Sequence, residues 1–378
     1  MRRRDLRLGV VLVTAIVFTA VTGTDARAQS ATEDHDARRA TYRSACAACH
    51  GAGGTGVEAS RVAFEEPLPD FTECTFASRE PDADWVAVAH DGGPARGFSE
   101  MMPAFGDALT AEELQWAVDH VRTFCADDDW PRGELNLPRP IVTEKAYPED
   151  EAVWTTSAAV EGDGALMHEI VYEKRFGARN QIEVVVPFGW HEMEVEGGLD
   201  WRGGVGDVAV GLKRALFHSL SSGSIFSATA EIVLPTGDEA DGFGKGTTVF
   251  EPFLSFGQLL PWDSFLHLQA GAELPFDTEV AHEEAFWRAA LGKSFAAGRL
   301  GFGRTWSPMI EILGARELTA GEDVVWDLLP QVQVTLNTRQ HVMANVGVRI
   351  PVDPDTGDAE LLVYLLWDWF DGGLTEGW

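Results

Sequence analysis

Basic residues are scarce in this chain of 378 residues. Lysine and arginine together number 29, against 60 aspartates and glutamates, and the formal net charge is -31. Nucleic-acid binding requires basic patches that neutralise phosphates. The composition therefore argues against a nucleic-acid partner, and we expect none.

Long apolar runs are also scarce. The most continuous one covers residues 8–21, after an arginine-rich start at 2–7 and before the small-residue sequence Ala-Arg-Ala at 26–28. A membrane-spanning helix needs about 20 apolar residues, so a retained anchor is the weaker alternative. The pattern predicts a secretory signal peptide over residues 1–28 and therefore an exported protein.

Only four cysteines are present, and two of them belong to Cys-Ala-Ala-Cys-His at residues 46–50. This is the attachment motif of c-type haem. On a helical turn Cys46 and Cys49 can both form thioethers to the porphyrin edge, and His50 then points an imidazole nitrogen at the iron. A thioredoxin-like redox pair would leave His50 without a role, and a zinc site would need a second ligand pair nearby. Cys74 and Cys125 remain, and we predict a disulfide between them because thiols oxidise outside the cytoplasm.

An electron-transfer haem needs a second axial ligand. Met102 and Pro103 lie in a loop before a helix that is predicted to begin after Thr110. Proline restricts the preceding residue to an extended conformation, which suits a loop that presents sulfur to iron. Met102 is the predicted ligand, and Met101 and His90 are alternatives. The choice matters because a second imidazole would lower the reduction potential.

These motifs together resemble class I monohaem cytochromes c. The sequence of N-terminal helix, Cys-x-x-Cys-His, Met-Pro loop and closing helix falls within residues 31–126. The resemblance implies an all-α cytochrome c fold and one covalent haem c, with His50 and Met102 as the two metal ligands. Residues 127–150 are charged and proline-rich without apolar periodicity, which predicts a linker.

Residues 151–378 contain no convincing long helix. Segments of about ten residues alternate apolar with polar or small side chains, as Ile182 and Val184 do with Gln181 and Glu183. We expect about twelve strands, near residues 153, 165, 181, 207, 225, 248, 264, 285, 302, 324, 340 and 360. An even number of such strands predicts an antiparallel transmembrane β-barrel. A soluble β-sandwich, which also alternates, is the alternative.

Short connections alternate with long acidic ones along this region. Residues 176–180 and 337–340 are short, whereas 191–207 and 236–247 are long. Outer-membrane barrels have short periplasmic turns and long external loops, so both termini are expected in the periplasm. The charged side chains expected to face the lumen have mixed sign, and we expect ion pairs among them to close it. They are Glu183, Lys213, Glu231, His267, Glu273, Arg288 and Arg349.

Two strings in the predicted barrel carry a second resemblance. GGVGDVAVGLKRAL at residues 203–216 and SATAEIVLPTGD at 227–238 resemble outer-membrane barrels associated with phenol meta-pathway operons. Such barrels commonly end in an aromatic-rich strand, and Phe370 or Trp378 is the expected assembly signal.

The barrel region shows neither a nucleophile elbow nor a metal-spaced histidine cluster, so we expect a protein that is not an enzyme. Two functions remain. The first is electron transfer by one haem tethered at the periplasmic face of the outer membrane, with a periplasmic redox protein as partner and outer-membrane lipid around the barrel. The second is a porin-like transporter with a cytochrome plug or redox-sensing domain. A haem enzyme is least expected, because a Met-ligated iron has no open position.

Replacing both Cys46 and Cys49 by Ser should abolish haem staining of the protein on a denaturing gel. Only thioether-linked haem stays with an unfolded chain, so the stain reports covalent attachment. Staining that persists in the double variant would overturn the haem assignment.

Overall fold

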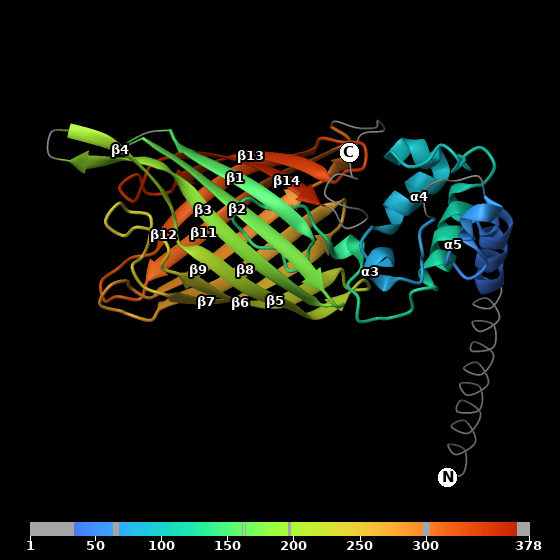
Figure 1. Ribbon diagram of the computed structural model, residues 1–378, viewed down its shortest axis with the longest axis horizontal. Helices are drawn as coiled ribbons and strands as arrows, with labels where there is room; N and C mark the ends of the chain where they lie inside the picture. Colours follow the sequence, from blue (N-terminus) through green and yellow to red (C-terminus); the bar gives the residue numbers. More distant parts are fainter. Residues whose placement is uncertain are drawn as a thin grey trace, which may run out of the picture. The chain divides into compact units, whose positions relative to one another are not determined.

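The computed structural model describes residues 34–62, 68–160, 162, 164–195, 198–296 and 303–368 (Figure 1). The predicted signal peptide and the predicted assembly signals Phe370 and Trp378 lie outside these residues. The chain divides into two compact units, one built from residues up to 73, 85–92 and 103–126, and the other from 74–84, 93–102 and 127 onward. Each unit is described by itself.

The first unit is helical. Residues 34–45 form a helix, followed by α2 (Ala47–His50), the short η1 (Ala59–Arg61), most of α4 (Asp82–Asp91) and α5 (Ala111–Arg122). Helix α5 begins at the predicted capping box, in which Thr110 Oγ1 accepts from the Glu113 N–H and the Glu113 carboxylate accepts from the Thr110 N–H. The buried face of α5 includes Leu114 and Val118. No helix among the described residues is long and apolar enough to cross a membrane.

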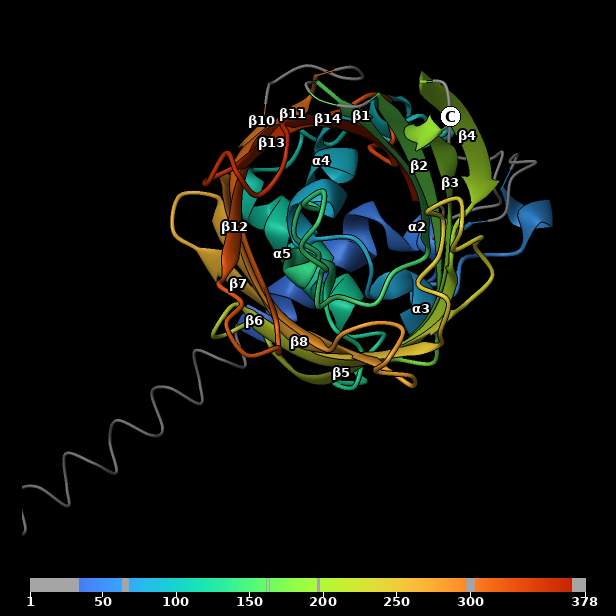
Figure 2. The same ribbon diagram turned by 90° about the vertical axis from the view of Figure 1, so that its left-hand side faces the viewer.

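The second unit is a closed antiparallel barrel of twelve strands, as predicted. Its strands are β1 (Glu151–Ala159), β2 (Ala165–Phe176), β3 (Asn180–Val195), β5 (Val208–Ser219), β6 (Ser224–Leu234), β7 (Val249–Leu260), β8 (Ser264–Pro275), β9 (Glu284–Lys293), β11 (Thr305–Glu317), β12 (Val325–Thr335), β13 (Val342–Pro351) and β14 (Glu360–Asp368). The short β10 (Phe295–Ala296) pairs with β11. Each strand of the ring pairs with two neighbours, including β1 with β14 and β9 with β11, and Figure 2 shows the closed ring.

The two faces of the strands divide as the alternation predicts. On β3, Gln181 and Glu183 are buried in the barrel, whereas Ile182 between them is 37% exposed. Backbone polar groups in a membrane must be bonded internally, which a closed ring achieves because it leaves no free edge. An apolar exterior then faces lipid, and the polar face points into the lumen.

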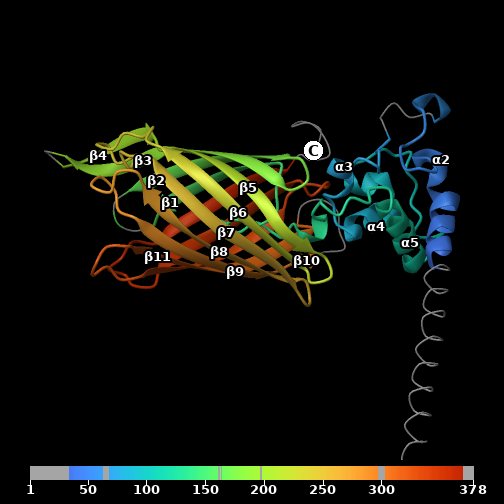
Figure 3. The same cartoon turned by 90° about the horizontal axis from the view of Figure 1, so that it is seen from below.

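The loops also follow the predicted asymmetry, with one correction. Residues 191–207 were expected to be a long loop, but β3 continues to Val195 and pairs with β4 (Gly198–Val205) as a hairpin. Long connections gather at the end of the barrel where this hairpin lies (Figure 3). A Cβ on Gly203 would lie 2.5 Å from the ring of Trp190, its partner across the hairpin. Glycines in this hairpin therefore make room for aromatic side chains.

Residues 127–129 of the predicted linker are exposed, but the rest of it does not form an exposed connection. Every residue from 131 to 150 is buried or half-buried, and the segment runs inside the ring of strands (Figure 2). Two stretches of the predicted cytochrome domain, 74–84 and 93–102, also cluster with the barrel. Arg79 pairs with Asp150 at 2.6 Å, and the Gly133 N–H bonds to the Ser78 carbonyl at 2.7 Å. These stretches contain α3 (Cys74–Ala77) and η2 (Gly93–Arg96), and η3 (Gly133–Leu135) begins the buried segment.

Candidate functional site

One turn of helix carries the predicted haem-attachment residues. Cys46 directly precedes α2, and the backbone N–H groups of Cys49 and His50 both bond to its carbonyl, at 3.2 and 2.9 Å. Cys46 and Cys49 are half-buried free thiols. The turn therefore gathers two thiols and one imidazole on a short rigid element, as thioether attachment requires.

The imidazole of His50 has the environment of a metal ligand. Its Nδ1 atom is buried and has no hydrogen-bond partner among the described residues. The ring lies 5.0 Å from the ring of Phe71, centroid to centroid. Burial lowers the pKa of His50, which favours the neutral form that binds metals. The donor set and this orphaned nitrogen fit a c-type haem.

The turn after α2 is fixed by close packing. Gly54 has φ +81°, and a Cβ there would lie 2.5 Å from the ring of Phe124. Tyr42 donates a hydrogen bond from its hydroxyl to the Gly51 carbonyl at 2.7 Å. Glycine at position 54 is thus required both by the backbone conformation and by the approach of Phe124.

The three candidates for the second axial ligand differ in exposure. Met101 is 53% exposed, whereas Met102 is half-buried and bonds through its backbone to Ser99 and Gly93. His90 is exposed, and its Nδ1 lies 2.6 Å from Asp91 Oδ1. Met102 is therefore the most sheltered of the three, and its role as ligand stays a prediction.

The loop that carries Met102 is bonded to a turn of the barrel. Arg339, in the turn between β12 and β13, donates to the Gly97 carbonyl at 3.0 Å, and its guanidinium lies 4.9 Å from the ring centre of Phe98. The next residue, Gln340, donates to Asp84 Oδ1 at 3.3 Å. The barrel thus holds the backbone of the loop in place.

The predicted disulfide is confirmed. Cys74, at the start of α3, and Cys125, shortly after α5, are disulfide-bonded to each other. The bond closes a chain segment that contains Met102. It therefore restricts the freedom of the loop in the unfolded chain.

The barrel lumen is filled by residues 131–150, which we call the luminal plug. Arg139 of the plug contacts Glu151 at 2.5 Å, Glu173 at 2.8 Å and Glu144 at 3.1 Å. Lys213 of β5 contacts Glu144 and Glu173 at 3.3 and 3.6 Å. Among the described residues, the expected ion pairs within the set of seven luminal side chains do not form. Lys213 pairs instead with Glu144 of the plug and with Glu173 of β2, so charges outside that set help to close the lumen.

The backbone of the plug is satisfied by side chains of the barrel wall. Glu311 of β11 accepts from the N–H groups of Ile141, Val142 and Thr143 at 2.9, 3.0 and 2.6 Å. Tyr364 of β14 donates to the Arg139 carbonyl at 2.7 Å. A buried, non-helical segment needs such partners because an unpaired backbone group is costly.

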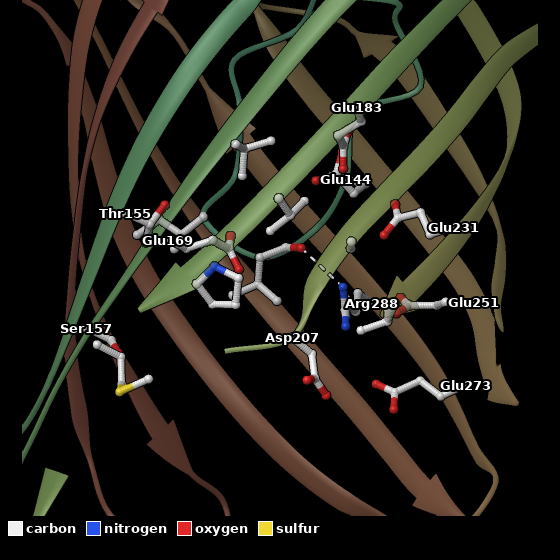
Figure 4. Close-up of a pocket in the computed structure, with 18 of the residues that line it drawn as sticks. Glu144, Thr155, Ser157, Glu169, Glu183, Asp207, Glu231, Glu251, Glu273 and Arg288 are labelled. Carbon is white, nitrogen blue, oxygen red and sulfur yellow. Dashed lines mark hydrogen bonds between the residues drawn. The ribbon is translucent and has the colours of Figure 1, made fainter. Parts of the chain in front are cut away.

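A cavity of about 490 Å³ remains beside the plug (Figure 4). Arg139 and Glu144 of the plug line it, together with wall residues that include Glu183, Glu231 and Arg288. Arg288 donates to the Val142 carbonyl at 3.3 Å and to Gln269 at 3.2 Å. Among the charged side chains of the lining, eight are acidic and four are basic, so acidic groups outnumber basic ones.

The predicted luminal residues do face inward. Glu183, Lys213, Glu231 and His267 are buried, and Glu273, Arg288 and Arg349 line the cavity. The sequence did not reveal Arg139, Glu173, Glu311 or Tyr364 as members of this network. One feature of the sequence did indicate such a network. The predicted luminal side chains carry charges of both signs, and so does the neighbouring segment 127–150.

Two family models match the chain. Residues 33–121 match "Cytochrome C oxidase, cbb3-type, subunit III", which covers the predicted haem motif. Residues 156–359, more than half of the chain, match "Putative MetA-pathway of phenol degradation". The chain belongs to this second family. The protein is thus a MetA-pathway family outer-membrane barrel with an N-terminal cytochrome c domain.

Solved structures similar to this MetA-pathway family member include a channel, a porin and an autotransporter domain. The COG4313 outer membrane channel from Pseudomonas putida F1 has 14% identity and a TM-score of 0.44, with 61% of this chain and 99% of that chain covered. The KdgM porin in complex with disordered oligogalacturonate has 8% identity and a TM-score of 0.38, with coverages of 58% and 99%. The β domain of the Bordetella autotransporter BrkA has 13% identity and a TM-score of 0.37, with coverages of 58% and 100%. No curated protein matches the chain.

Arg139→Met should destabilise the barrel strongly. It leaves Glu151 and Glu173 buried without this cation, and breaking a buried ion pair costs about 3–5 kcal/mol. Arg202→Met is the matched control, because both Arg202 and its partner Asp200 are exposed, and the loss of such a surface pair should cost about 1 kcal/mol or less. Urea unfolding in lipid vesicles measures both. Equal losses for the two variants would contradict the central role of Arg139.

Proposed function

We propose that this protein transfers electrons through one covalently bound haem c, held at the periplasmic face of the outer membrane by the barrel. The observation that carries the proposal is the buried Nδ1 atom of His50, which has no hydrogen-bond partner among the described residues and lies on the same helical turn as two free thiols. This turn lies within the region that matches a cytochrome c family. Cys46 and Cys49 would attach the haem, and His50 and Met102 would ligate its iron.

Each of these residues has a separate task. Two thioethers keep the cofactor attached when a partner approaches, and the neutral imidazole of His50 donates to the metal. Met102 supplies a thioether, which raises the reduction potential relative to a second imidazole. When bound, the haem supplies reversible one-electron chemistry. If His50 and Met102 both ligate the iron, it would keep no position for a substrate, so the proposed protein would be a carrier and not an enzyme.

The barrel acts as a tether in this proposal. Arg339 and Gln340 bond to segments of the cytochrome region, and the Arg79–Asp150 pair attaches another segment to the end of the plug. Short turns on the side of the chain termini are the periplasmic side of outer-membrane barrels. The haem domain would therefore face the periplasm, where a soluble redox protein is the proposed partner.

A porin-like transporter is the second candidate, and the cavity of about 490 Å³ is the observation that favours it. The luminal plug argues against free passage, because its backbone and charges bond to wall residues on β2, β5, β11 and β14. Opening the lumen would require these bonds to break together. We therefore favour the tether.

Met102→His should retain covalent haem and lower the reduction potential. Imidazole favours ferric iron more than a thioether does. Protein-film voltammetry measures the potential, and the absorption band of sulfur-to-iron charge transfer should disappear. Met101→His is the matched control. It should leave the reduction potential and the charge-transfer band unchanged, since Met101 is more exposed.

The ligand assignment fails if Met101→His removes the charge-transfer band while Met102→His retains it. An unchanged potential in both variants would exclude either methionine as ligand. The proposed carrier function itself fails if the purified holoprotein shows no reversible one-electron wave.

The protein alone should not carry electrons across the outer membrane. The apolar band of such barrels is about 25 Å tall, the sequence holds one haem motif, and tunnelling falls steeply with distance. Liposomes with a reductant inside and an impermeant oxidant outside test this, with protease digestion to establish orientation. Rapid transfer that the Cys46→Ser/Cys49→Ser variant lacks would show that one haem suffices.

A further inference from the structure

We propose that Glu149, Glu151 and Asp368 form a calcium site at the seam where the barrel closes. Glu151 and Asp368 are directly opposite each other in the pairing of the first strand, β1, with the last, β14. Glu149 lies at the end of the luminal plug. One carboxylate oxygen from each residue lies within 4.8 Å of the other two.

All three carboxylates are removed from water. The exposed fractions of Glu149, Glu151 and Asp368 are 1%, 1% and 5%. Like charges directly opposite on neighbouring strands are destabilising, and burial increases the penalty. A cation between the carboxylates would convert this repulsion into attraction.

Asp368 provides a second observation that points to a ligand. Its Oδ1 atom is buried and has no hydrogen-bond partner within the part of the chain that the structure describes. Its backbone N–H bonds to the His341 carbonyl at 2.8 Å, which holds the residue in place. A buried oxygen without a partner costs about 1–3 kcal/mol, and more when it is charged.

The carboxylates around the seam outnumber the cationic side chains, so a divalent cation would balance part of their charge. Two groups of three carboxylates lie in this part of the lumen, Glu144, Glu173 and Glu183 being the other group. Arg139, Lys145 and Lys213 are the cations that pair with them among the described residues. Six carboxylates therefore face three cations. Lys145 contacts Glu149 and Glu151, and Asp368 has no ion pair among the described residues.

Calcium fits this donor set better than magnesium. Ca²⁺ takes oxygen ligands at about 2.3–2.6 Å in flexible geometries, so two of its ligands can lie up to about 5 Å apart. Mg²⁺ demands near-ideal octahedral geometry and usually keeps several waters. Three buried carboxylates from separate segments offer little room for that water shell.

The site would connect three parts of the chain. Bound calcium would join the first strand, the last strand and the end of the plug, and a ligand that binds only the folded state stabilises it. The site does not depend on the haem or on the proposed electron transfer.

The test uses the full chain refolded in detergent without lipopolysaccharide, which itself binds divalent cations. After chelation, equilibrium dialysis with radioactive Ca²⁺ gives the stoichiometry and affinity, and circular dichroism gives the thermal midpoint. The site variants are Asp368→Asn and Glu149→Gln. Glu231→Gln is the matched control, since Glu231 is a buried luminal acid outside the seam.

We expect one Ca²⁺ per chain in the native sequence and in Glu231→Gln, with a rise in thermal midpoint on calcium addition. Both site variants should bind at least tenfold more weakly and lose that rise. Heat-modifiable gel mobility shows which variants are folded. The test requires only one of the two site variants to fold. The proposal is overturned if the native chain binds no Ca²⁺ at millimolar concentration, or if a folded site variant binds as tightly as Glu231→Gln.

Discussion

The ion pairs of Arg139 are the interaction on which the lumen depends. A barrel in a membrane must turn its polar side chains inward, and here the inward wall carries an excess of carboxylates. Arg139 enters from the plug and meets Glu144, Glu151 and Glu173 at once. Because these groups are dehydrated, each requires an opposite charge, which fixes where the plug lies. The segment is therefore a structural part of the barrel.

The plug and a turn of the barrel both bond to stretches of the cytochrome region. Electron transfer needs a covalently held cofactor with a firmly placed ligand loop, and membrane attachment needs a closed ring of strands. Bonds from Arg339 to Gly97 and from Arg79 to Asp150 attach stretches of the cytochrome region to the barrel. The bond to Gly97 thus acts on the loop that carries Met102, the proposed ligand.

Features with local signals could be predicted from the sequence. The Cys-x-x-Cys-His turn and the Thr110–Glu113 cap depend on residues close in the chain, and the twelve strands depend on alternation that each strand shows by itself. The plug has no such signal, because Thr143 bonds to Glu311, 168 residues away. Individual polar groups of the plug bond to side chains of the barrel wall. The sequence of the plug therefore shows neither the helical nor the strand periodicity of apolar residues. The length and acidity of residues 191–207 indicated a loop, because the fit of Gly203 against Trp190 depends on the partner strand and leaves no local signal.

The depth of the plug within the ring limits the order of assembly. Its partners lie on strands from β2 to β14, so the segment must be in place before β14 pairs with β1 and closes the ring. Threading it afterwards would drag several charged groups through a finished lumen. The cytochrome domain precedes the plug in the chain and carries its own disulfide, so it would already be compact at that moment. The pairing of β14 with β1 would then complete the barrel only in chains whose plug already lies in its final position.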